Sequence, residues 1–242
     1  MNKGIFITGT DTDVGKTIVT AGLLNLLCSN GVNAVPMKPV QTGCVLRNGV
    51  YRAPDLDFSI STAGLTISEE EYSCMSPYKY GPACSPHLAG ELAGSFPKVE
   101  KILYSLKKME SKREFVLVEG AGGVMVPLNE SEMMIDLMKE IDYPVILVSH
   151  TGLGTINHTL LSIQVLRNAG INILGVIFNN TKPPYEAFEF IREDNVKTIA
   201  ERGQVNVLGV IDYLKNIQDN IDALKDCFNR TVDYDVICRL IF

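Results

Sequence analysis

The sequence has no tryptophan, only three histidines and no C-x-x-C pair among its six cysteines. The histidines have no cysteine or carboxylate at ligand spacing, so they predict no metal site, and scattered cysteines predict reduced thiols. No signal peptide or apolar run of the roughly 18 residues that span a membrane is present, so we expect a cytoplasmic protein. Acidic residues outnumber basic ones, 28 to 22, which argues against nucleic acid or a membrane as partner.

The composition is that of a folded chain, with 46% hydrophobic and 21% charged residues. No repeat, low-complexity segment or linker divides it, so we expect a single domain over residues 1–242. Short apolar runs alternate with segments of helical spacing, which predicts a parallel sheet with helices on both faces. The expected strands are residues 4–8, 33–37, 115–118, 144–148, 173–178 and 205–210.

The expected helices follow the strands, except in one turn-rich stretch. Residues 40–83 contain many helix-breaking residues and are predicted to hold one short helix. A serine followed by proline predicts a helix start at His87. The remaining expected helices cover residues 17–28, 98–112, 155–169 and 185–202.

A glycine-containing loop follows the first expected strand and begins the first helix. It reads GTDTDVGKT over residues 9–17, and strand, turn and helix in this order are what a phosphate-binding loop requires. Lys16 is expected to reach the β- and γ-phosphates and Thr17 to bind Mg²⁺. The spacing is irregular, because Thr10 stands where glycine is usual and Gly9 is one residue early. The fold class predicted is therefore the P-loop NTPase type of α/β sheet.

Carboxylates near this loop are needed to hold the metal of a nucleotide. Glu119 ends an apolar run and precedes a glycine-rich turn, which favours a place near the phosphates; the alternative is a structural strand-end glutamate. Asp55 follows a proline and is the second candidate, although it is equally suited to a helix N-terminus. Asp57 is a rival for the same role.

Other polar residues stand at strand ends. Lys38 suits a phosphoryl group or an anionic substrate, although a lone lysine is more often a surface charge. Asn179 and Asn180 offer donors and acceptors for a base edge, although Asn-Asn is also a common turn. Because ligands of parallel sheets bind at the carboxyl ends of the strands, we expect these residues to gather at one edge with Glu119 and the loop.

Five motifs stand in order along the chain: GTDTDVGKT (9–17), KPVQTG (38–43), SPH (85–87), VEGAGG (118–123) and GLGTINH (152–158). Together they resemble the dethiobiotin synthetase family of biotin biosynthesis, and the resemblance covers residues 3–214. It implies an enzyme that adds CO₂ or bicarbonate carbon to 7,8-diaminopelargonate and closes a cyclic urea through a carbamic-phosphoric anhydride. ATP is the implied co-substrate and Mg²⁺ the implied cofactor, with ADP and phosphate released.

The resemblance also implies roles for individual residues. Lys38 would be the catalytic lysine near the carbamate and the γ-phosphate, with Thr12 and Lys16 beside it. The residues that would bind Mg²⁺ are Thr17, Asp55 and Glu119. The nucleotide would be bound by Asp13, Val14, Gly15, Lys16, Thr17, Ile18, Asp55, Glu119, Gly120, Ala121, Gly122, Asn179, Asn180, Asp212 and Tyr213.

A homodimer is implied as well, with a substrate site shared between its subunits. Lys38 and Thr42 would contact substrate from one subunit, Thr42 replacing a serine and keeping its hydroxyl. The residues that would reach the substrate of the neighbouring subunit are Leu153, Gly154 and Asn157.

The chain departs from the family near the base. Asp212 and Tyr213 replace a common Pro-Trp pair, and Asn180 replaces an aspartate. A carboxylate at Asp212 would accept from an exocyclic amine, so we expect ATP to serve at least as well as CTP, and both better than GTP. The tail from residue 215 matches poorly and receives no predicted role.

Two other classes compete with this interpretation. Nucleotide-driven switch ATPases of the chromosome-partitioning or septum-site type share the loop style, but they typically carry a Lys-Gly-Gly run where this chain has residues 10–12 as Thr-Asp-Thr. The sequence also shows no basic surface or amphipathic C-terminal membrane helix of the kind such proteins use. A related ATP-dependent amidotransferase would need a glutaminase domain, for which 242 residues are too few.

Overall fold

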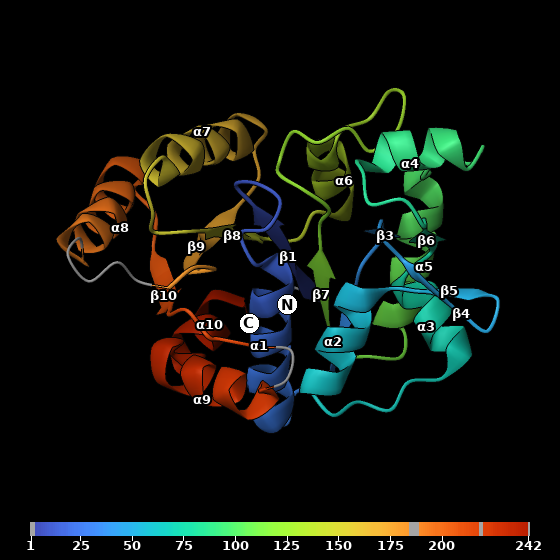
Figure 1. Cartoon of the computed structure of the whole chain (residues 1–242), viewed down its shortest axis with the longest axis horizontal. Coiled ribbons are helices and arrows are strands. Elements are labelled where there is room, and N and C mark those ends of the chain that lie inside the picture. Colours follow the sequence, from blue (N-terminus) through green and yellow to red (C-terminus); the bar gives the residue numbers. More distant parts are fainter. Residues whose placement is uncertain (1–2, 184–188, 218–219, 242) are drawn as a thin grey trace.

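A six-stranded parallel sheet forms the centre of the computed structural model, which describes residues 3–183, 189–217 and 220–241 (Figure 1). The strand order is β10-β9-β8-β1-β7-β2, so the strand before the phosphate loop lies in the middle. This confirms the predicted P-loop type of α/β sheet. Its strands are β1 (Gly4–Gly9), β2 (Ala34–Met37), β7 (Phe115–Glu119), β8 (Val145–Ser149), β9 (Ile173–Asn179) and β10 (Val207–Ile211).

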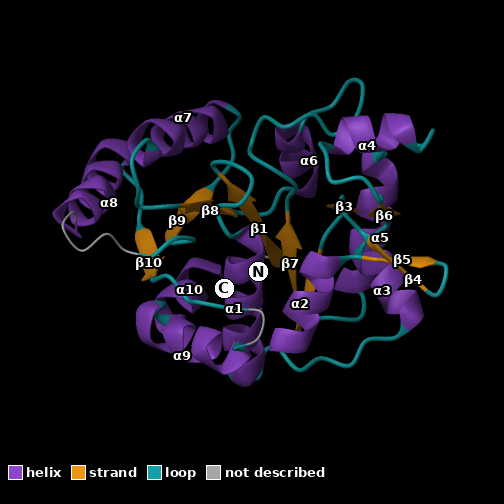
Figure 2. Cartoon of the chain, in the orientation of Figure 1, coloured by secondary structure: helices purple, strands orange, loops and turns teal. Residues whose placement is uncertain are grey.

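Helices cover both faces of this sheet, as its apolar strands require (Figure 2). Side chains alternate along a strand, so Ile5 and Ile7 enter one apolar core and Phe6 the other, and all three are fully buried. The first core is closed by α1 (Lys16–Ser29), α9 (Ile221–Thr231) and α10 (Tyr234–Ile241). The second is closed mainly by α5 (Val99–Glu110), α6 (Met134–Ile141), α7 (Thr155–Asn168) and α8 (Glu189–Gly203).

The stretch 40–83 is more ordered than predicted. One short helix was expected, but the structure has two, α2 (Pro54–Thr62) and α3 (Glu69–Met75). Helix α2 begins at Pro54, and proline suits the first turn of a helix. Helix α3 is capped by Ser68, whose hydroxyl accepts a hydrogen bond from the backbone N–H of Glu71. Short strands complete the stretch: β3 (Val40–Gln41), β4 (Val45–Arg47), β5 (Val50–Arg52) and β6 (Tyr78–Lys79).

Other helices also differ from the expected ranges. Helix α4 (Pro86–Leu92) begins at the proline itself, one residue before the predicted start. Helix α6 was not predicted, and the expected start of α8 at residue 185 lies outside the described residues. No helix in the described part of the chain is long and apolar enough to cross a membrane.

The tail without a predicted role has a packing role in the structure. Helix α9 lies against α1, the helix that begins at the phosphate loop (Figure 1), and α10 adds Ile237 and Ile241 to the same apolar core. Phe228 of α9 is fully buried, and a Cβ at Gly22 of α1 would come within 2.3 Å of its ring. The close approach of the two helices therefore depends on glycine at position 22.

Candidate nucleotide and catalytic site

The loop between β1 and α1 has a backbone that constrains its residue types. Gly15 precedes α1 with a φ of +92°, in the left-handed region that glycine tolerates. A Cβ there would lie 2.0 Å from Nδ2 of Asn179, which donates a hydrogen bond to the carbonyl oxygen of Val14 at 3.1 Å. The end of β9 therefore packs directly on the loop and holds its shape.

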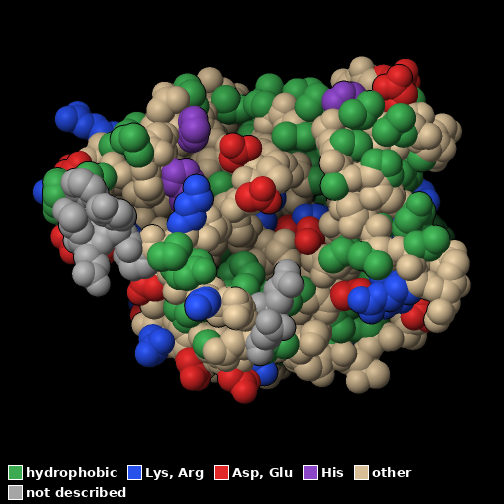
Figure 3. Space-filling model, viewed as in Figure 1, with side chains coloured by type: hydrophobic (Ala, Val, Ile, Leu, Met, Phe, Trp, Pro, Cys, Tyr) green, Lys and Arg blue, Asp and Glu red, His purple; other side chains and the backbone are tan. Residues whose placement is uncertain are grey.

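A cavity of about 780 Å³ opens beside this loop, at the carboxyl ends of β1, β2 and β7. Acidic and basic side chains meet at a hollow near the middle of this face of the molecule (Figure 3). The structure thus brings most of the predicted phosphate, metal and catalytic residues together. Those lining the cavity are Thr12, Asp13, Gly15, Lys16, Thr17, Ile18, Lys38, Thr42, Asp55, Glu119, Ala121 and Gly122.

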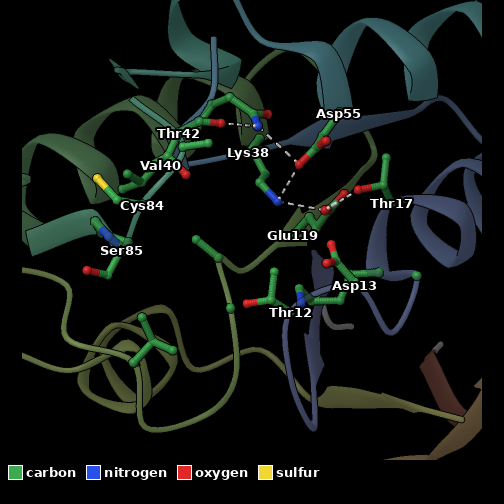
Figure 4. Close-up of a pocket in the computed structure, with 18 of the residues that line it drawn as sticks. Thr12, Asp13, Thr17, Lys38, Val40, Thr42, Asp55, Cys84, Ser85 and Glu119 are labelled. Atoms are coloured by element: carbon green, nitrogen blue, oxygen red, sulfur yellow. Dashed lines mark hydrogen bonds and ion pairs between the residues drawn. The ribbon is translucent and has the colours of Figure 1, made fainter. Parts of the chain in front are cut away.

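Lys38 joins the two candidate metal carboxylates (Figure 4). Its Nζ lies 2.7 Å from Oε1 of Glu119 and 2.8 Å from Oδ2 of Asp55, and it donates a third hydrogen bond to the carbonyl oxygen of Gly120 at 3.1 Å. The Thr17 hydroxyl donates to the same Glu119 oxygen at 2.8 Å. Lys38 is therefore no surface charge: it is 5% exposed and all three of its donors are used.

The oxygen groups of this cluster fit Mg²⁺. Oε2 of Glu119 and Oδ1 of Asp55 accept no hydrogen bond from any residue that the structure describes. The Thr17 hydroxyl keeps lone pairs while donating its proton. No group of three or more His, Cys, Asp or Glu that could hold a metal is found in the described ranges. Two carboxylates and a hydroxyl suit an ion that keeps several waters and takes phosphate oxygens, as Mg²⁺ does.

Burial and neighbouring charges set the ionisation of these groups. Burial alone would lower the pKa of Lys38, but attraction by Glu119 and then Asp55 outweighs it, so the pKa is raised and the lysine is charged at neutral pH. Burial would raise the pKa of Asp55, but Lys38 lowers it below the ordinary value. Burial, and then repulsion by Lys38, lower the pKa of Lys16 to about 8. The Lys16 ammonium donates to the Asp11 carbonyl oxygen at 2.8 Å.

Asp57 occupies a different place from its rival Asp55. Its Oδ1 accepts from the Tyr72 hydroxyl at 2.8 Å and lies 3.3 Å from Nη2 of Arg52. It lines a separate cavity of about 230 Å³ near the β4–β5 hairpin. The geometry therefore favours Asp55 as the metal carboxylate.

The predicted base-binding residues surround a second cavity, of about 390 Å³, that meets the first at Ile18 and Thr181. Asn179 keeps its Oδ1 free of hydrogen bonds from the described residues, whereas both amide groups of Asn180 are used. Asn180 accepts from the Thr151 hydroxyl and donates to a backbone carbonyl. The predicted residues that line this second cavity are Ile18, Asn179, Asn180, Asp212 and Tyr213.

Asp212 has a partner that the sequence did not suggest. Its Oδ1 lies 3.0 Å from Nη2 of Arg192 on α8, which also donates to the Thr151 hydroxyl at 3.1 Å. The carboxylate is 74% exposed, so its second oxygen faces solvent at the cavity rim. An exposed pair of this kind contributes little stability.

Three predicted substrate residues lie apart from Lys38. Leu153, Gly154 and Asn157, at the start of α7, line a groove of about 550 Å³ that shares no lining residue with the first cavity. Leu153 is 95% exposed.

Two other predicted nucleotide residues do not line either cavity in the way expected. Val14 is buried beneath the loop, and the carbonyl oxygen of Gly120 accepts a hydrogen bond from Lys38.

Sequence reasoning missed some residues of the cavity wall. Gln41, Cys84 and Ser85 all line it. Cys84 and Ser85 follow a turn rather than a strand end, so strand position gave no signal for them. Gln41 lies inside the KPVQTG motif, but only its neighbours received roles.

Comparison with known proteins finds a matching family model and similar sequences. An AAA domain family model matches residues 3–220. The ATP-dependent dethiobiotin synthetase BioD of Clostridium novyi is 37% identical and covers 100% of this chain and 99% of its own length. The protein of the same name from Thermodesulfovibrio yellowstonii is 32% identical, covering 99% of this chain and 100% of its own length.

Solved structures of lower identity share the fold. The septum site-determining protein MinD complexed with Mg-ADP from Pyrococcus horikoshii has a TM-score of 0.58 at 18% identity, covering 94% of this chain and 93% of its own. The MinD cell division protein of Aquifex aeolicus has a TM-score of 0.57 at 15% identity, covering 98% and 96%. This likeness concerns the fold alone. The sequence relatives, in contrast, match over nearly the full length of the chain and carry the same name. The chain belongs to the ATP-dependent dethiobiotin synthetase family.

Proposed function

We propose that this enzyme converts 7,8-diaminopelargonate, CO₂ and ATP into dethiobiotin, ADP and phosphate, with Mg²⁺ as cofactor. The observation that carries the proposal is the meeting of Lys16, Lys38, Asp55 and Glu119 in one cavity beside the phosphate loop. Two cations and two carboxylates suit chemistry in which anions move onto and off phosphorus. Family membership supports the same substrates.

The reaction needs charge stabilisation at each step rather than a protein nucleophile. One substrate amine takes up CO₂ and loses a proton, which gives a carbamate. A carbamate oxygen attacks the γ-phosphorus and ADP leaves. The second amine then attacks the carbonyl carbon and loses a proton to solvent, and phosphate leaves as the ring closes. Lys38, charged at neutral pH because its pKa is raised, would stabilise the carbamate and the transferring phosphoryl group.

The phosphate loop would hold the nucleotide through these steps. Lys16 would turn from the Asp11 carbonyl to the β- and γ-phosphates, and Thr12 lies on the same cavity wall. When bound, Mg²⁺ would neutralise phosphate charge, held by Thr17, Asp55 and Glu119. The free Oδ1 of Asn179 would accept a hydrogen bond from the exocyclic amine of the base.

A homodimer would complete the substrate site. The groove of Leu153, Gly154 and Asn157 shares no lining residue with the Lys38 cavity of the same chain. A second subunit would bring this groove to the cavity of the first. The 95% exposure of Leu153 and 57% exposure of Leu161 on the groove suit an apolar contact with a second copy.

Product formation tests the proposal directly. The protein is incubated with 7,8-diaminopelargonate, bicarbonate and Mg-ATP, and dethiobiotin and ADP are measured by mass spectrometry and chromatography. We expect equimolar dethiobiotin and ADP, and none without the diamine. ATP hydrolysis that proceeds without the diamine and yields no dethiobiotin would instead favour the septum-site type of ATPase.

A further inference from the structure

Gln41 lies in the wall of the catalytic cavity between two residues of the proposed reaction, Lys38 and Thr42. It ends the short strand β3, which pairs with β6, and is only 5% exposed. Its side-chain Nε2 donates to the Thr42 carbonyl oxygen at 2.9 Å and to Oδ2 of Asp55 at 3.2 Å. Both amide hydrogens therefore hold residues of the site.

The orientation of this amide is fixed by its partners. A carbonyl oxygen and an ionised carboxylate can only accept hydrogen bonds. If the amide were turned over, Oε1 of Gln41 would face both acceptors and lose both bonds. Oε1 itself is buried and has no partner within the described residues, so nothing else in that part of the chain sets the direction of the side chain.

The effect on Asp55 is specific to one oxygen. Gln41 and Lys38 both reach Oδ2, whereas Oδ1 accepts no hydrogen bond from the residues described. Lys38 divides its hydrogen bonds among Asp55, Glu119 and the Gly120 carbonyl oxygen. Among the described residues, Asp55 is the one charged group that Gln41 contacts. If Lys38 turned to an anionic intermediate, the amide of Gln41 would still hold Asp55.

We propose that Gln41 is a positioning residue for Mg²⁺, one that holds Asp55 by Oδ2 and leaves Oδ1 directed to the metal. The inference rests on the proposed function, because it gives Asp55 the metal role assigned there. Groups that orient a metal ligand typically change metal affinity roughly 10- to 100-fold when removed. Gln41 meets the condition for such an effect, since it contacts the ligand and faces the same cavity.

Metal binding itself is the first test. Mn²⁺ replaces Mg²⁺, and its binding to the protein with ADP is followed by electron paramagnetic resonance. Gln41→Met removes the donors at similar length, and Gln41→Asn keeps an amide about 1.5 Å too short to reach Asp55. Both are expected to bind Mn²⁺ roughly 10- to 100-fold more weakly than the unaltered protein. The matched control Gln164→Met, at an exposed residue bonded to Asn168, is expected to bind normally.

A double substitution asks whether Gln41 acts through Asp55. In an Asp55→Asn background, adding Gln41→Met is expected to change Mn²⁺ affinity less than about twofold, because coupled residues do not add. Initial rates provide a second readout: the Mg²⁺ concentration for half-maximal rate rises, while KM for the diamine at saturating Mg²⁺ stays within about twofold.

Two results would overturn the role of Gln41: normal Mn²⁺ affinity in a folded Gln41→Met or Gln41→Asn protein, or an equal loss with and without the Asp55 carboxylate. These differ from failure of the proposed function. If the unaltered protein with ADP bound no Mn²⁺ and made no dethiobiotin, the function itself would be wrong.

Discussion

The buried charge of Lys16 lowers the free energy of unfolding, and the proposed function gives the same charge a role at the phosphates. Burial and the charge of Lys38 lower its pKa from 10.5 to about 8. Between these values the unfolded chain binds more protons than the folded one, so the contribution of Lys16 to stability rises with pH across this window. Below about pH 8 the full penalty is present, on the order of 3 kcal/mol.

We therefore expect opposite effects when Lys16 is changed to methionine. Without nucleotide at pH 7, Lys16→Met should raise the free energy of unfolding by about 1–3 kcal/mol, because the buried charge is removed. Turnover should fall by about 2.7–4 kcal/mol of transition-state stabilisation, as for loss of one oxyanion donor. Urea unfolding and initial rates measure the two. A variant with normal turnover at saturating ATP would remove Lys16 from the phosphate site.

The Mg²⁺ dependence of the reaction rate can distinguish the role of Glu119 from that of nearby acidic residues. Glu119→Gln keeps the shape and the Lys38 contact through oxygen, but loses the charge that a divalent cation prefers. We expect the Mg²⁺ concentration for half-maximal rate to rise at least about tenfold. The melting temperature should fall as well, because the buried Lys38 ammonium loses the carboxylate that does most to raise its pKa. Asp57→Asn is the control, because Asp57 pairs with Arg52 instead. Equal Mg²⁺ curves for the two variants would return Glu119 to a structural role.

The sequence predicted which polar residues lie close together where those residues stand at strand ends. Lys38 and Glu119 each follow a short apolar run, and parallel strands bring such ends together. The sequence therefore predicted that the two residues lie close, and in the structure they are 2.7 Å apart. The sequence did not predict that Asp55, rather than Asp57, would pair with Lys38. Both aspartates lie in the first turn of α2, and only packing decides which one faces the cavity. Arg192 was missed for a similar reason, since a helix residue gives no sign of which strand end it reaches.

At the scale of elements, strands were easier to predict than short helices. Continuous apolar runs mark β1, β7 and β8 because these strands are buried on both faces. Helix α6 begins after Met133, which is not a usual N-terminal residue, and its Asp136 carboxylate instead accepts from the Met133 N–H. For α2 the signal was present but was interpreted as a break, since proline also begins helices.

The contact between α1 and α9 gives a prediction against helix propensity. Alanine is favoured over glycine in a helix by about 1 kcal/mol. At Gly22, however, a Cβ would lie 2.3 Å from the ring of Phe228, and such overpacking typically costs about 1–3 kcal/mol. We expect Gly22→Ala to lower the free energy of unfolding, and Phe228→Leu to relieve part of that loss in the double variant. A more stable Gly22→Ala protein would show that α9 does not pack on α1 as described.

The cavity at the carboxyl ends of β9 and β10 predicts the order of nucleotide use. Oδ1 of Asn179 can only accept, and the Asp212 carboxylate at the rim also accepts. Adenine and cytosine carry an exocyclic amine that donates, whereas guanine has a carbonyl oxygen at that edge. We expect kcat/KM for ATP to equal or exceed that for CTP, with GTP lowest. A preference for GTP would mean that the base is bound elsewhere.

At the scale of the whole molecule, the proposed substrate residues of one chain line two different hollows. The cavity beside the phosphate loop lies at the carboxyl ends of β1, β2 and β7, whereas the groove is lined by residues at the start of α7. In the chain, α7 follows β8, and it lies on the β8 and β9 side of the sheet (Figure 1). The two hollows have no lining residue in common. In the proposed homodimer, the groove of one copy would meet the catalytic cavity of the other.

Mixed dimers test this arrangement quantitatively. Lys38→Ala and Asn157→Ala proteins are each expected to be nearly inactive alone, because every site lacks one essential group. In a dimer of one chain of each kind, one site combines the intact Lys38 with the intact Asn157, and the other combines both substitutions. Random association makes about half of the dimers mixed, so coexpression should restore about a quarter of the unaltered activity. If each chain carried its own complete site, mixing would restore none, and the shared substrate site would have to be abandoned.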